Sequence, residues 1–493
     1  MAVPMSYFQG EPLKIGNETQ LLIDDHIIED RWALERIIHP PSKHLLNPIL
    51  VKEKPWEGDI ALSPYVMWDE DFGRYRMWYK CFSLTNYWGA GGPPYHLSYA
   101  ESDDGINWEK PDLDVSDYPG YPISNVVYTG TYRQRTQGVQ VIKTPDQSDP
   151  DKRYMYIHVE SIPHPEEGLQ SGVTVAYSPD GLRWTMPEPP KHILDYHSDC
   201  LNHVVYDPQE EQWLLYCRPI HMFNSGRRDL RGGQIGGRHM RRRVSVMTSK
   251  DFENWSYPRT CMYPDEMDTP DYDSCTVFRW ADQFIMLYAA MEGDVTGSNE
   301  VRLASSRDGV NWERFYTREP YIARGREGDW DAGQVTVSGP PVIQGDTMLI
   351  YYSGTPNTQY ETTTQSGIAV AMAKVDRFVE QRGGDRPGYL LTKEFVVEGN
   401  RLKINTVMPG MPYHEQFIRV EIARHPPLGG HHGSSQPYPG FSFEDSDVLE
   451  GSRTDMTVTW NGSADISELA GKPVYLRFEI VNMGLFSFKI TQE

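Results

Sequence analysis

Seven carboxylic acids stand at comparable points along the chain, beside short apolar stretches of alternating pattern that are typical of strands. Five precede such a stretch and two follow one: Asp59, Asp199, Asp271, Asp273 and Asp331 come before, and Glu160 and Glu292 come after. Carboxylates that converge on one point support two kinds of chemistry. They act as acid and base on a bound substrate, or they supply oxygen ligands to a divalent cation.

The first kind of chemistry is narrow in its requirements. Cleavage of a glycosidic bond needs one carboxyl group to protonate the leaving oxygen and a second to act as base or nucleophile. A further group often keeps the acid protonated. The histidines show no His-x-x-x-His or His-Glu spacing of a zinc site. The pattern therefore favours glycoside hydrolysis without a required cofactor.

An internal repeat indicates which elements position these acids. The phrase Ser-x-Asp-Gly-x-x-Trp occurs at 102–108, 178–184 and 306–312, and at 249–255 with Phe252 in place of Gly. The repeated aspartates, with Asp376 as a fifth copy that lacks the Trp, follow one another at intervals of 57 to 76 residues. Each interval holds two or three alternating strands and room for a fourth, which is the content of one propeller blade. The phrase itself is interpreted as a structural turn.

These units predict an all-β chain, a five-bladed β-propeller followed by a C-terminal antiparallel β-sandwich. We expect a disordered or tag-like leader at 1–14, a catalytic propeller at 15–391 and the sandwich at 392–493, where alternating strands are joined by Gly- and Pro-rich loops. Helical repeats are excluded, because the apolar pattern has period 2 and Pro and Gly interrupt it every 10–20 residues.

In a propeller, the start of the first strand and the end of the second strand of every blade lie on the same face. That geometry predicts one central pocket, and it selects the residues expected to line it. The expected catalytic residues are Asp59, Asp199, Asp273, Asp271 and Glu292. The expected substrate-binding residues are Trp56, Lys80, Gln137, Glu160, His197, Arg218, His221, Asp331 and Gln334. A structural calcium ion in the central channel is an alternative use of the acids, although no metal site is assigned.

The stretch "PWEGDIALSPYVMWDEDFGRYRMWYK" and the five strand pairs resemble the five-bladed propeller glycosidases of glycoside hydrolase families 32, 43, 68 and 117 and their unclassified relatives. The resemblance covers residues 15–390, and the tail resembles the β-sandwich often appended to such proteins. It implies that Asp59 is the base or nucleophile and that Asp199 tunes a neighbouring pKa. It implies a general acid on blade four, where Asp273, Asp271 and Glu292 compete.

The sequence departs from this resemblance in two places. The fructosidase signatures Trp-x-Asn-Asp-Pro and Arg-Asp-Pro are absent, and the expected blade-four acid is most often a Glu. The substrate class is therefore left open between a furanoside and an anionic glycan. Two alternatives remain, a sialidase-like hydrolase and a carbohydrate-binding propeller without catalysis. The first needs six blades and three pocket arginines, and the second predicts shallow sites repeated in every blade.

Residues 225–243 are rich in arginine, with seven Arg and one acid in a chain of net charge −22. Guanidinium groups suit carboxylate or sulfate groups of an anionic sugar. The alternative is that these arginines pair with acids of the same chain or of a neighbouring subunit, so a homo-oligomer stays open.

Bulk composition excludes other classes of function. The negative charge argues against a nucleic-acid partner. No run of 18 apolar residues is present, so no membrane partner is expected. The five cysteines form no Cys-x-x-Cys pair and are interpreted as reduced. Aromatic residues, including 13 Trp and 30 Tyr, suit strands and an oligo- or polysaccharide substrate. The location is left open: periplasmic or secreted if a leader has been removed, otherwise cytoplasmic.

Overall fold

The computed structural model describes most of the chain. It leaves out residues 1–11, 59, 88, 90–91, 133–135, 146–147, 167, 197, 200–201, 222–223, 227–237, 294, 360, 362–364, 412–413 and 425–435, and the side chains of 60, 61, 224–226 and 238–240. The described residues form strands almost throughout, with one four-residue helix, α1 (Leu84–Tyr87), and three short 3-10 turns, η2 (Pro55–Glu57), η3 (Pro150–Lys152) and η4 (Ser467–Leu469). No described helix is long and apolar enough to cross a membrane.

The chain divides into two compact units. The larger unit comprises Pro40–Arg279 and Gln283–Ala373, and the smaller comprises Met1–His39, Trp280–Asp282 and Lys374–Glu493. The sequence predicts the boundary at 391/392 and places the segment from residue 15 in the propeller. The segment up to His39 instead groups with the C-terminal strands, and Leu13, expected in the leader, pairs with Phe395.

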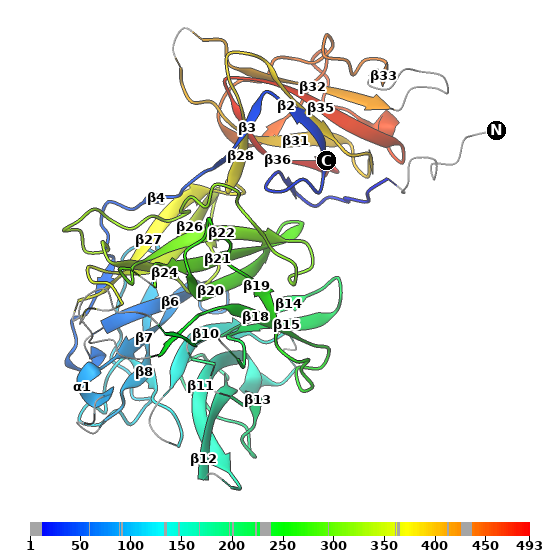
Figure 1. Cartoon of the computed structure of the whole chain (residues 1–493). Helices are drawn as coiled ribbons and strands as arrows, with labels where there is room; N and C mark the ends of the chain where they lie inside the picture. Colours follow the sequence, from blue (N-terminus) through cyan, green and yellow to red (C-terminus); the bar gives the residue numbers. More distant parts are fainter. Residues whose placement is uncertain are drawn as a thin grey trace. The chain divides into compact units, whose positions relative to one another are not determined.

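The larger unit is a five-bladed β-propeller, as predicted, and Figure 1 traces its blades in chain order from blue to yellow. Three blades are separate four-stranded antiparallel sheets. Blade one is β6 (Ile60–Asp69), β7 (Arg74–Phe82), β8 (Tyr95–Ser102) and β9 (Val126–Tyr128). Blade two is β10 (Gln137–Lys143), β11 (Tyr154–His164), β12 (Gly168–Ser178) and β13 (His192–Leu194). Blade three is β14 (His203–Asp207), β15 (Gln212–Cys217), β18 (Val244–Ser249) and β19 (Arg259–Met262).

Blades four and five are joined into one sheet by a single parallel pairing of Asn299 with Gln334. Blade four is β20 (Asp271–Trp280), β21 (Gln283–Met291), β22 (Asn299–Ser306) and β23 (Glu313–Arg314). Blade five is β24 (Gln334–Val337), β25 (Val342–Gln344), β26 (Thr347–Thr355) and β27 (Gly367–Lys374). The early strands β4 (Ser42–Lys43) and β5 (Leu50–Val51) pair with β27 and complete blade five, so distant parts of the chain close the ring.

In three blades the repeated turn holds the blade to the one before it. In the first copy, Asp104 Oδ1 accepts the amide hydrogens of Ile106 and Asn107, and Ser102 Oγ accepts that of Gly105. The left-handed glycine then offers its carbonyl to an aromatic side chain of the preceding blade: Tyr351 Oη to Gly105 at 2.9 Å, Trp78 Nε1 to Gly181 at 2.8 Å, and Tyr216 Oη to Gly309 at 2.6 Å. The structural interpretation of this phrase thus matches its contacts.

The third copy of the turn lacks this glycine. Phe252 occupies the left-handed position with φ 63°, and its ring packs against Trp213 of the same blade with the ring centroids 5.0 Å apart.

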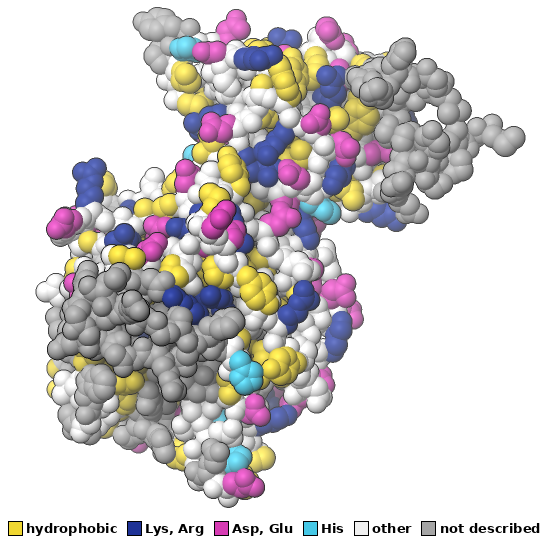
Figure 2. Space-filling view, in the orientation of Figure 1, with side chains coloured by type: hydrophobic (Ala, Val, Ile, Leu, Met, Phe, Trp, Pro, Cys, Tyr) yellow, Lys and Arg dark blue, Asp and Glu magenta, His cyan; other side chains and the backbone are white. Residues whose placement is uncertain are grey.

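The surface charge is evenly spread on the face that Figure 2 shows. Acidic and basic side chains are interspersed over its described residues, so the negative charge is not gathered there.

The smaller unit is an antiparallel β-sandwich of two six-stranded sheets. One sheet contains β1 (Gln20–Leu21), β3 (Leu34–Ile38), β28 (Val379–Gly383), β31 (Arg401–Val407), β34 (Arg453–Thr457) and β36 (Gly484–Thr491). The other contains β2 (Ile28–Trp32), β29 (Gly388–Thr392), β30 (Phe395–Val396), β32 (Phe417–Arg424), β33 (Gln436–Pro437) and β35 (Pro473–Val481). Alternate residues of both sheets, such as Ile404 and Phe478, form its core.

Candidate functional site

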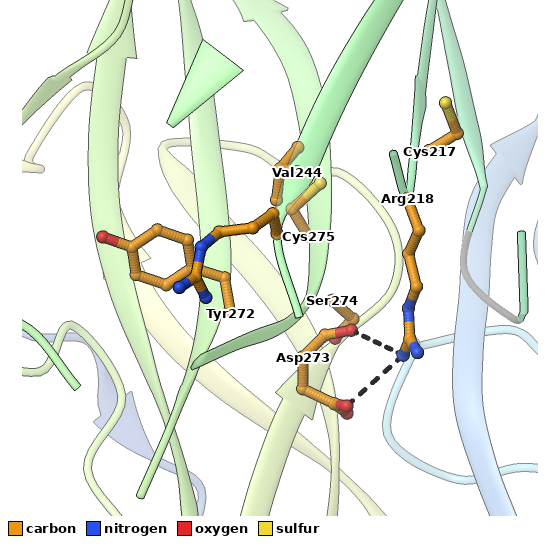
Figure 3. A pocket seen from close by; sticks show the side chains of 8 residues that line it. Cys217, Arg218, Val244, Tyr272, Asp273, Ser274 and Cys275 are labelled. Carbon is orange, nitrogen blue, oxygen red and sulfur yellow. Dashed lines mark hydrogen bonds and ion pairs between the residues drawn. The ribbon is translucent and has the colours of Figure 1, made fainter. Parts of the chain in front are cut away.

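Two carboxylates from different blades meet at one guanidinium group. Arg218 follows β15, and its Nη1 lies 2.8 Å from Asp199 Oδ2. Its Nη2 lies 3.4 Å from Asp273 Oδ1 and donates to the Asp273 carbonyl at 3.1 Å, as Figure 3 shows. The Arg218 side chain is 9% exposed, whereas Asp199 and Asp273 are 38% and 20% exposed. The carboxylates thus reach solvent while the cation between them is buried.

Local backbone geometry directs these side chains to the same edge. Asp199 stands just before β14 in a left-handed conformation with φ 64°, which Asp tolerates better than most residues. Its carbonyl accepts a hydrogen bond from Asn202 Nδ2 at 2.8 Å. Asp273 is the third residue of β20, and Arg218 immediately follows β15. The predicted face, where first strands begin and second strands end, therefore carries all three residues.

Asp273 has a second cationic neighbour. Arg242 Nε lies 2.9 Å from Asp273 Oδ1, while Arg242 Nη1 contacts Met291 Sδ at 3.0 Å at the end of β21. The guanidinium groups of Arg218 and Arg242 therefore fix the position of the Asp273 side chain at this edge.

Asp271 is buried beneath the arginine-rich segment. Its Oδ1 accepts the amide hydrogen of Arg242 at 2.8 Å, and its Oδ2 accepts from Arg241 Nη1 at 3.3 Å. Its side chain has no exposed surface. Of the two aspartates that the sequence left competing, Asp273 faces the accessible edge and Asp271 anchors the arginines.

The arginine-rich segment is described only in part. Its ends form a two-stranded ribbon, β16 (Asn224–Gly226) and β17 (Arg238–Met240), while 227–237 lie outside the described residues. In the described remainder, Arg241 and Arg242 bind acids of their own chain, and Arg243 donates to the carbonyl of Pro270 at 2.8 Å. These three contacts agree with the internal-pairing alternative.

Glu292 follows β21 at the same edge of blade four and is half-buried. Its carbonyl caps a turn by accepting the amide hydrogen of Gly297 at 2.8 Å. Within the described part of the chain, its carboxyl group makes no hydrogen bond or ion pair. Its carboxyl group therefore stands outside the guanidinium pairs that hold Asp199 and Asp273. We call Asp199, Arg218, Asp273 and Glu292 the acidic rim.

Glu160 holds a loop rather than facing the rim. Its carboxylate is buried and accepts from Tyr128 Oη at 2.9 Å, His158 Nε2 at 3.1 Å and the amides of Thr131 and Tyr132. Burial alone would raise the pKa of Glu160, but the hydrogen bond and charge of His158 and these donors hold the pKa below its usual range. Glu160 is therefore a fixed anion that orders residues 131–132.

Trp56 is part of the packed interior of blade one. Its Nε1 donates to Asn125 Oδ1 at 2.7 Å, and its ring is packed with Tyr118 and Val126. Lys80 is buried in β7 with its Nζ 5.9 Å from the Tyr95 ring centroid. Neither residue has the exposed surface expected of a substrate-stacking wall.

The remaining predicted residues are dispersed. Gln137 begins β10 and is buried, with an Oε1 that has no partner in the described part of the protein. Asp331 is buried and bound by Lys43 Nζ at 2.6 Å, which ties β4 to blade five. Gln334 accepts from Asn299 Nδ2 at 3.2 Å across blades four and five, and His221 is exposed. Asp59 and His197 lie outside the described residues, so their predicted roles stay predictions.

Sequence reasoning overlooked two residues with clear roles. Arg242 contacts Asp273, but the sequence analysis treats it only as one of the cations of the arginine-rich segment. The two residues are far apart in the sequence, so no local pattern connects them. Glu57 is buried and binds Lys110 Nζ at 2.7 Å and Tyr79 Oη at 2.7 Å. Burial opposes its ionisation, yet the charge of Lys110 and two amide donors keep the pKa of Glu57 below its usual range.

Metal ligation has no visible support in the described residues, which contain no group of three or more His, Cys, Asp or Glu side chains placed to hold an ion. The acidic rim fails as a cation site for a physical reason, because arginine already neutralises Asp199 and Asp273.

Neither a family profile nor a curated protein matches the sequence. Several solved structures have similar folds. An N-acetylgalactosamine deacetylase from F. plautii has a TM-score of 0.44 and 17% identity, covering 70% of this chain and 96% of that one. A glycosyl hydrolase from Bacteroides ovatus has a TM-score of 0.44 and 13% identity, covering 69% and 96%. A fructofuranosidase from Schwanniomyces occidentalis has a TM-score of 0.41 and 10% identity, covering 97% and 99%. At these values the likeness does not extend to activity.

Proposed function

We propose that the propeller unit is a glycoside hydrolase that cleaves an oligo- or polysaccharide at the acidic rim. The observation that supports this proposal is the division of labour among its carboxyl groups. Asp199 and Asp273 are paired with guanidinium groups, whereas Glu292 has no cationic partner in the described residues. Glycosidase chemistry needs this inequality, because one carboxyl must donate a proton while another stays ionised.

In the proposed mechanism, Glu292 protonates the leaving glycosidic oxygen. Asp273 or Asp199 acts as the carboxylate that activates water or attacks the sugar carbon, and Arg218 fixes their orientation. Asp59, which the sequence resemblance implies as base or nucleophile, remains a competing proposal for the second role. The sugar passes through a cationic transition state, which nearby carboxylates stabilise electrostatically.

The proposal is tested with a screen of aryl glycosides, in furanose and pyranose forms, together with neutral and anionic polysaccharides. We expect wild-type protein to release reducing ends from at least one of them. Asp273→Asn should reduce kcat by about 10²–10⁴-fold, the range for loss of a positioned acid or base.

Glu210→Gln is the matched control, because Glu210 is an exposed acid in the β14–β15 hairpin, at the opposite end of its blade. It should retain wild-type rates. Binding of a polysaccharide without release of reducing ends, or full activity of folded Asp273→Asn, would contradict the proposal and favour a carbohydrate-binding propeller.

A further inference from the structure

The propeller channel has a second opening, at the end where the innermost strands finish. A cavity of about 210 Å³ lies there, and all five blades contribute to its wall. One residue from each blade illustrates this: Tyr65, Ile142, Val204, Val277 and Pro340. We call this cavity the rear mouth. It is large enough for a small ring compound, since a cavity of about 150 Å³ accepts benzene.

The polar groups between the inner strands of blades two and three are satisfied within the protein. Gln140 Nε2 donates to the Val204 carbonyl at 2.8 Å, and the Val204 amide donates to Gln140 Oε1 at 2.7 Å. Tyr65 is buried and hydrogen bonded to the same Gln140 side chain. These groups are therefore not the ones that a ligand would need to satisfy.

Two other polar groups of the wall are not satisfied. The His203 ring is 1% exposed, and neither of its nitrogen atoms has a hydrogen-bond partner in the described structure. Burial lowers the pKa of His203 to about 3, so the ring is neutral near pH 7 and carries one N–H donor. Arg279 Nη1 is also buried without a hydrogen-bond partner, 3.9 Å from Asp207 Oδ1. These nitrogen atoms have almost no accessible surface, so a ligand in the cavity would meet the rest of the Arg279 side chain, which is 21% exposed.

The rest of the wall is apolar and aromatic, and its charged members are cations. Tyr206 and Trp213 stand at the opening with ring centroids 5.2 Å apart, and Val204, Val277 and Phe278 lie deeper. Among the described residues, the lining contains Arg279 and Lys143 but no carboxylate. Lys143 is paired with Asp69 and Asp71, at 2.8 and 2.7 Å, whereas Arg279 has the looser pair with Asp207 at 3.9 Å, which makes Arg279 the better-placed anion partner.

We propose that the rear mouth is a second binding site, which takes a small organic anion with an apolar body, of the class of aromatic carboxylates. The apolar wall covers the ring, and the carboxylate pairs with the exposed part of the Arg279 guanidinium group. This site is separate from the acidic rim and does not depend on the proposed hydrolase activity.

The test uses benzoate as the probe and benzamide as its neutral counterpart, with binding followed by calorimetry or ligand-observed NMR. For a ligand of this size we expect a Kd on the order of 1 mM for benzoate and weaker binding of benzamide. Arg279→Gln, which keeps much of the apolar stem, should weaken benzoate binding about tenfold, as expected for one lost charged hydrogen bond. It should leave benzamide binding unchanged.

Lys250→Gln removes an exposed cation from the edge of blade three and should change neither affinity. The proposal is overturned if benzoate does not bind, if benzamide binds as tightly, or if folded Arg279→Gln binds benzoate like wild type. Should Arg279→Gln fail to fold, Val205→Cys provides a second measurement. Val205 is half-buried in the wall, so benzoate should slow labelling of the new thiol, and an unchanged labelling rate overturns the proposal.

Discussion

At the acidic rim, carboxylates and guanidinium groups from three strand ends pair in contact with solvent. At the rear mouth, the described lining is mostly apolar and aromatic, includes the neutral His203, and holds no carboxylate. Both regions are built from the same inner strands, and His203 of the rear mouth directly follows Asn202, which binds Asp199. The difference shows that residues only a few positions apart on an inner strand can line two chemically different sites. This is possible because the two ends of the strand lie in different surroundings.

The largest loss of activity among the following variants is expected at the centre of the acidic rim. Arg218→Met should abolish the common partner of Asp199 and Asp273 and reduce glycosidase kcat by at least about 100-fold, because both carboxylates lose their fixed position. Removing one member of a buried ion pair costs about 3–5 kcal/mol. Partial exposure of the two aspartates reduces this loss to roughly 2 kcal/mol of unfolding free energy, measured by urea denaturation.

Arg183→Met is the control for this effect, because Arg183 forms an exposed ion pair with Asp180 in which its side chain is 64% exposed. It should change stability by less than about 0.5 kcal/mol. Equal stability of the two variants would show that the rim pairs are ordinary surface contacts.

The seams between blades support both regions, so damage to a seam should affect both alike. Gly309 has φ 70°, and a Cβ there would lie 2.4 Å from Leu214 Cδ1. Gly309→Ala should therefore lower the unfolding free energy by about 3 kcal/mol, against about 1 kcal/mol for Gly73→Ala, where φ is 62° and no atom lies within 4 Å. At temperatures where Gly309→Ala is still folded, its glycosidase activity and its affinity for benzoate should both be close to those of the wild type. Loss of only one of them would contradict a shared scaffold.

A smaller effect is expected in the pH dependence of stability, to which the buried His203 of the rear mouth contributes. His203 has a pKa near 3 when folded and an ordinary value near 6.5 when unfolded, so the unfolded state takes up a proton first as the pH falls. Its stabilising contribution is complete above pH 6.5 and declines between pH 6.5 and 3. The loss from pH 7 to 5 is about 2 kcal/mol.

His203→Gln should remove that part of the pH slope, as measured by denaturation at several pH values. His96 is the internal comparison, because burial also lowers its pKa to about 3 although it lies in blade one, against Tyr118. His96→Gln should flatten the profile by a similar amount. An unchanged slope in both variants would mean that neither ring is buried as a neutral group.

The blades could be predicted from the sequence because their signals are local. Alternation and the Ser-x-Asp-Gly-x-x-Trp turns lie within one unit, and they identified five blades and the shared face. The strand pairings that complete the sandwich and the fifth blade join residues that are far apart in the sequence. Gln20 pairs with Phe488, and Lys43 pairs with Ala371, and no short-range pattern connects such residues. The assignment of the N-terminal strands to the sandwich could therefore not be read from composition.

The candidate site was predicted in outline and not in detail. Strand ends gave Asp199, Arg218, Asp273 and Glu292, but Asp271 and Asp273 are two residues apart and differ in burial only through what packs on them. Trp56 was predicted to stack on the substrate because aromatic residues at strand ends either stack on ligands or pack in the core. Its hydrogen-bond partner Asn125 lies 69 residues later, so the sequence around Trp56 does not show that it packs in the core.

The central claim is that Glu292 is the proton donor of a glycosidase. The direct test compares Glu292→Gln on two aryl glycosides of one sugar, one with a 2,4-dinitrophenyl leaving group and one with an unactivated phenyl group. A proton donor is needed only for the poor leaving group. The account predicts a loss of about 100-fold or more in the rate of the bond-breaking step for the phenyl glycoside and little loss for the dinitrophenyl glycoside. Equal losses on both, or none on either, would contradict it.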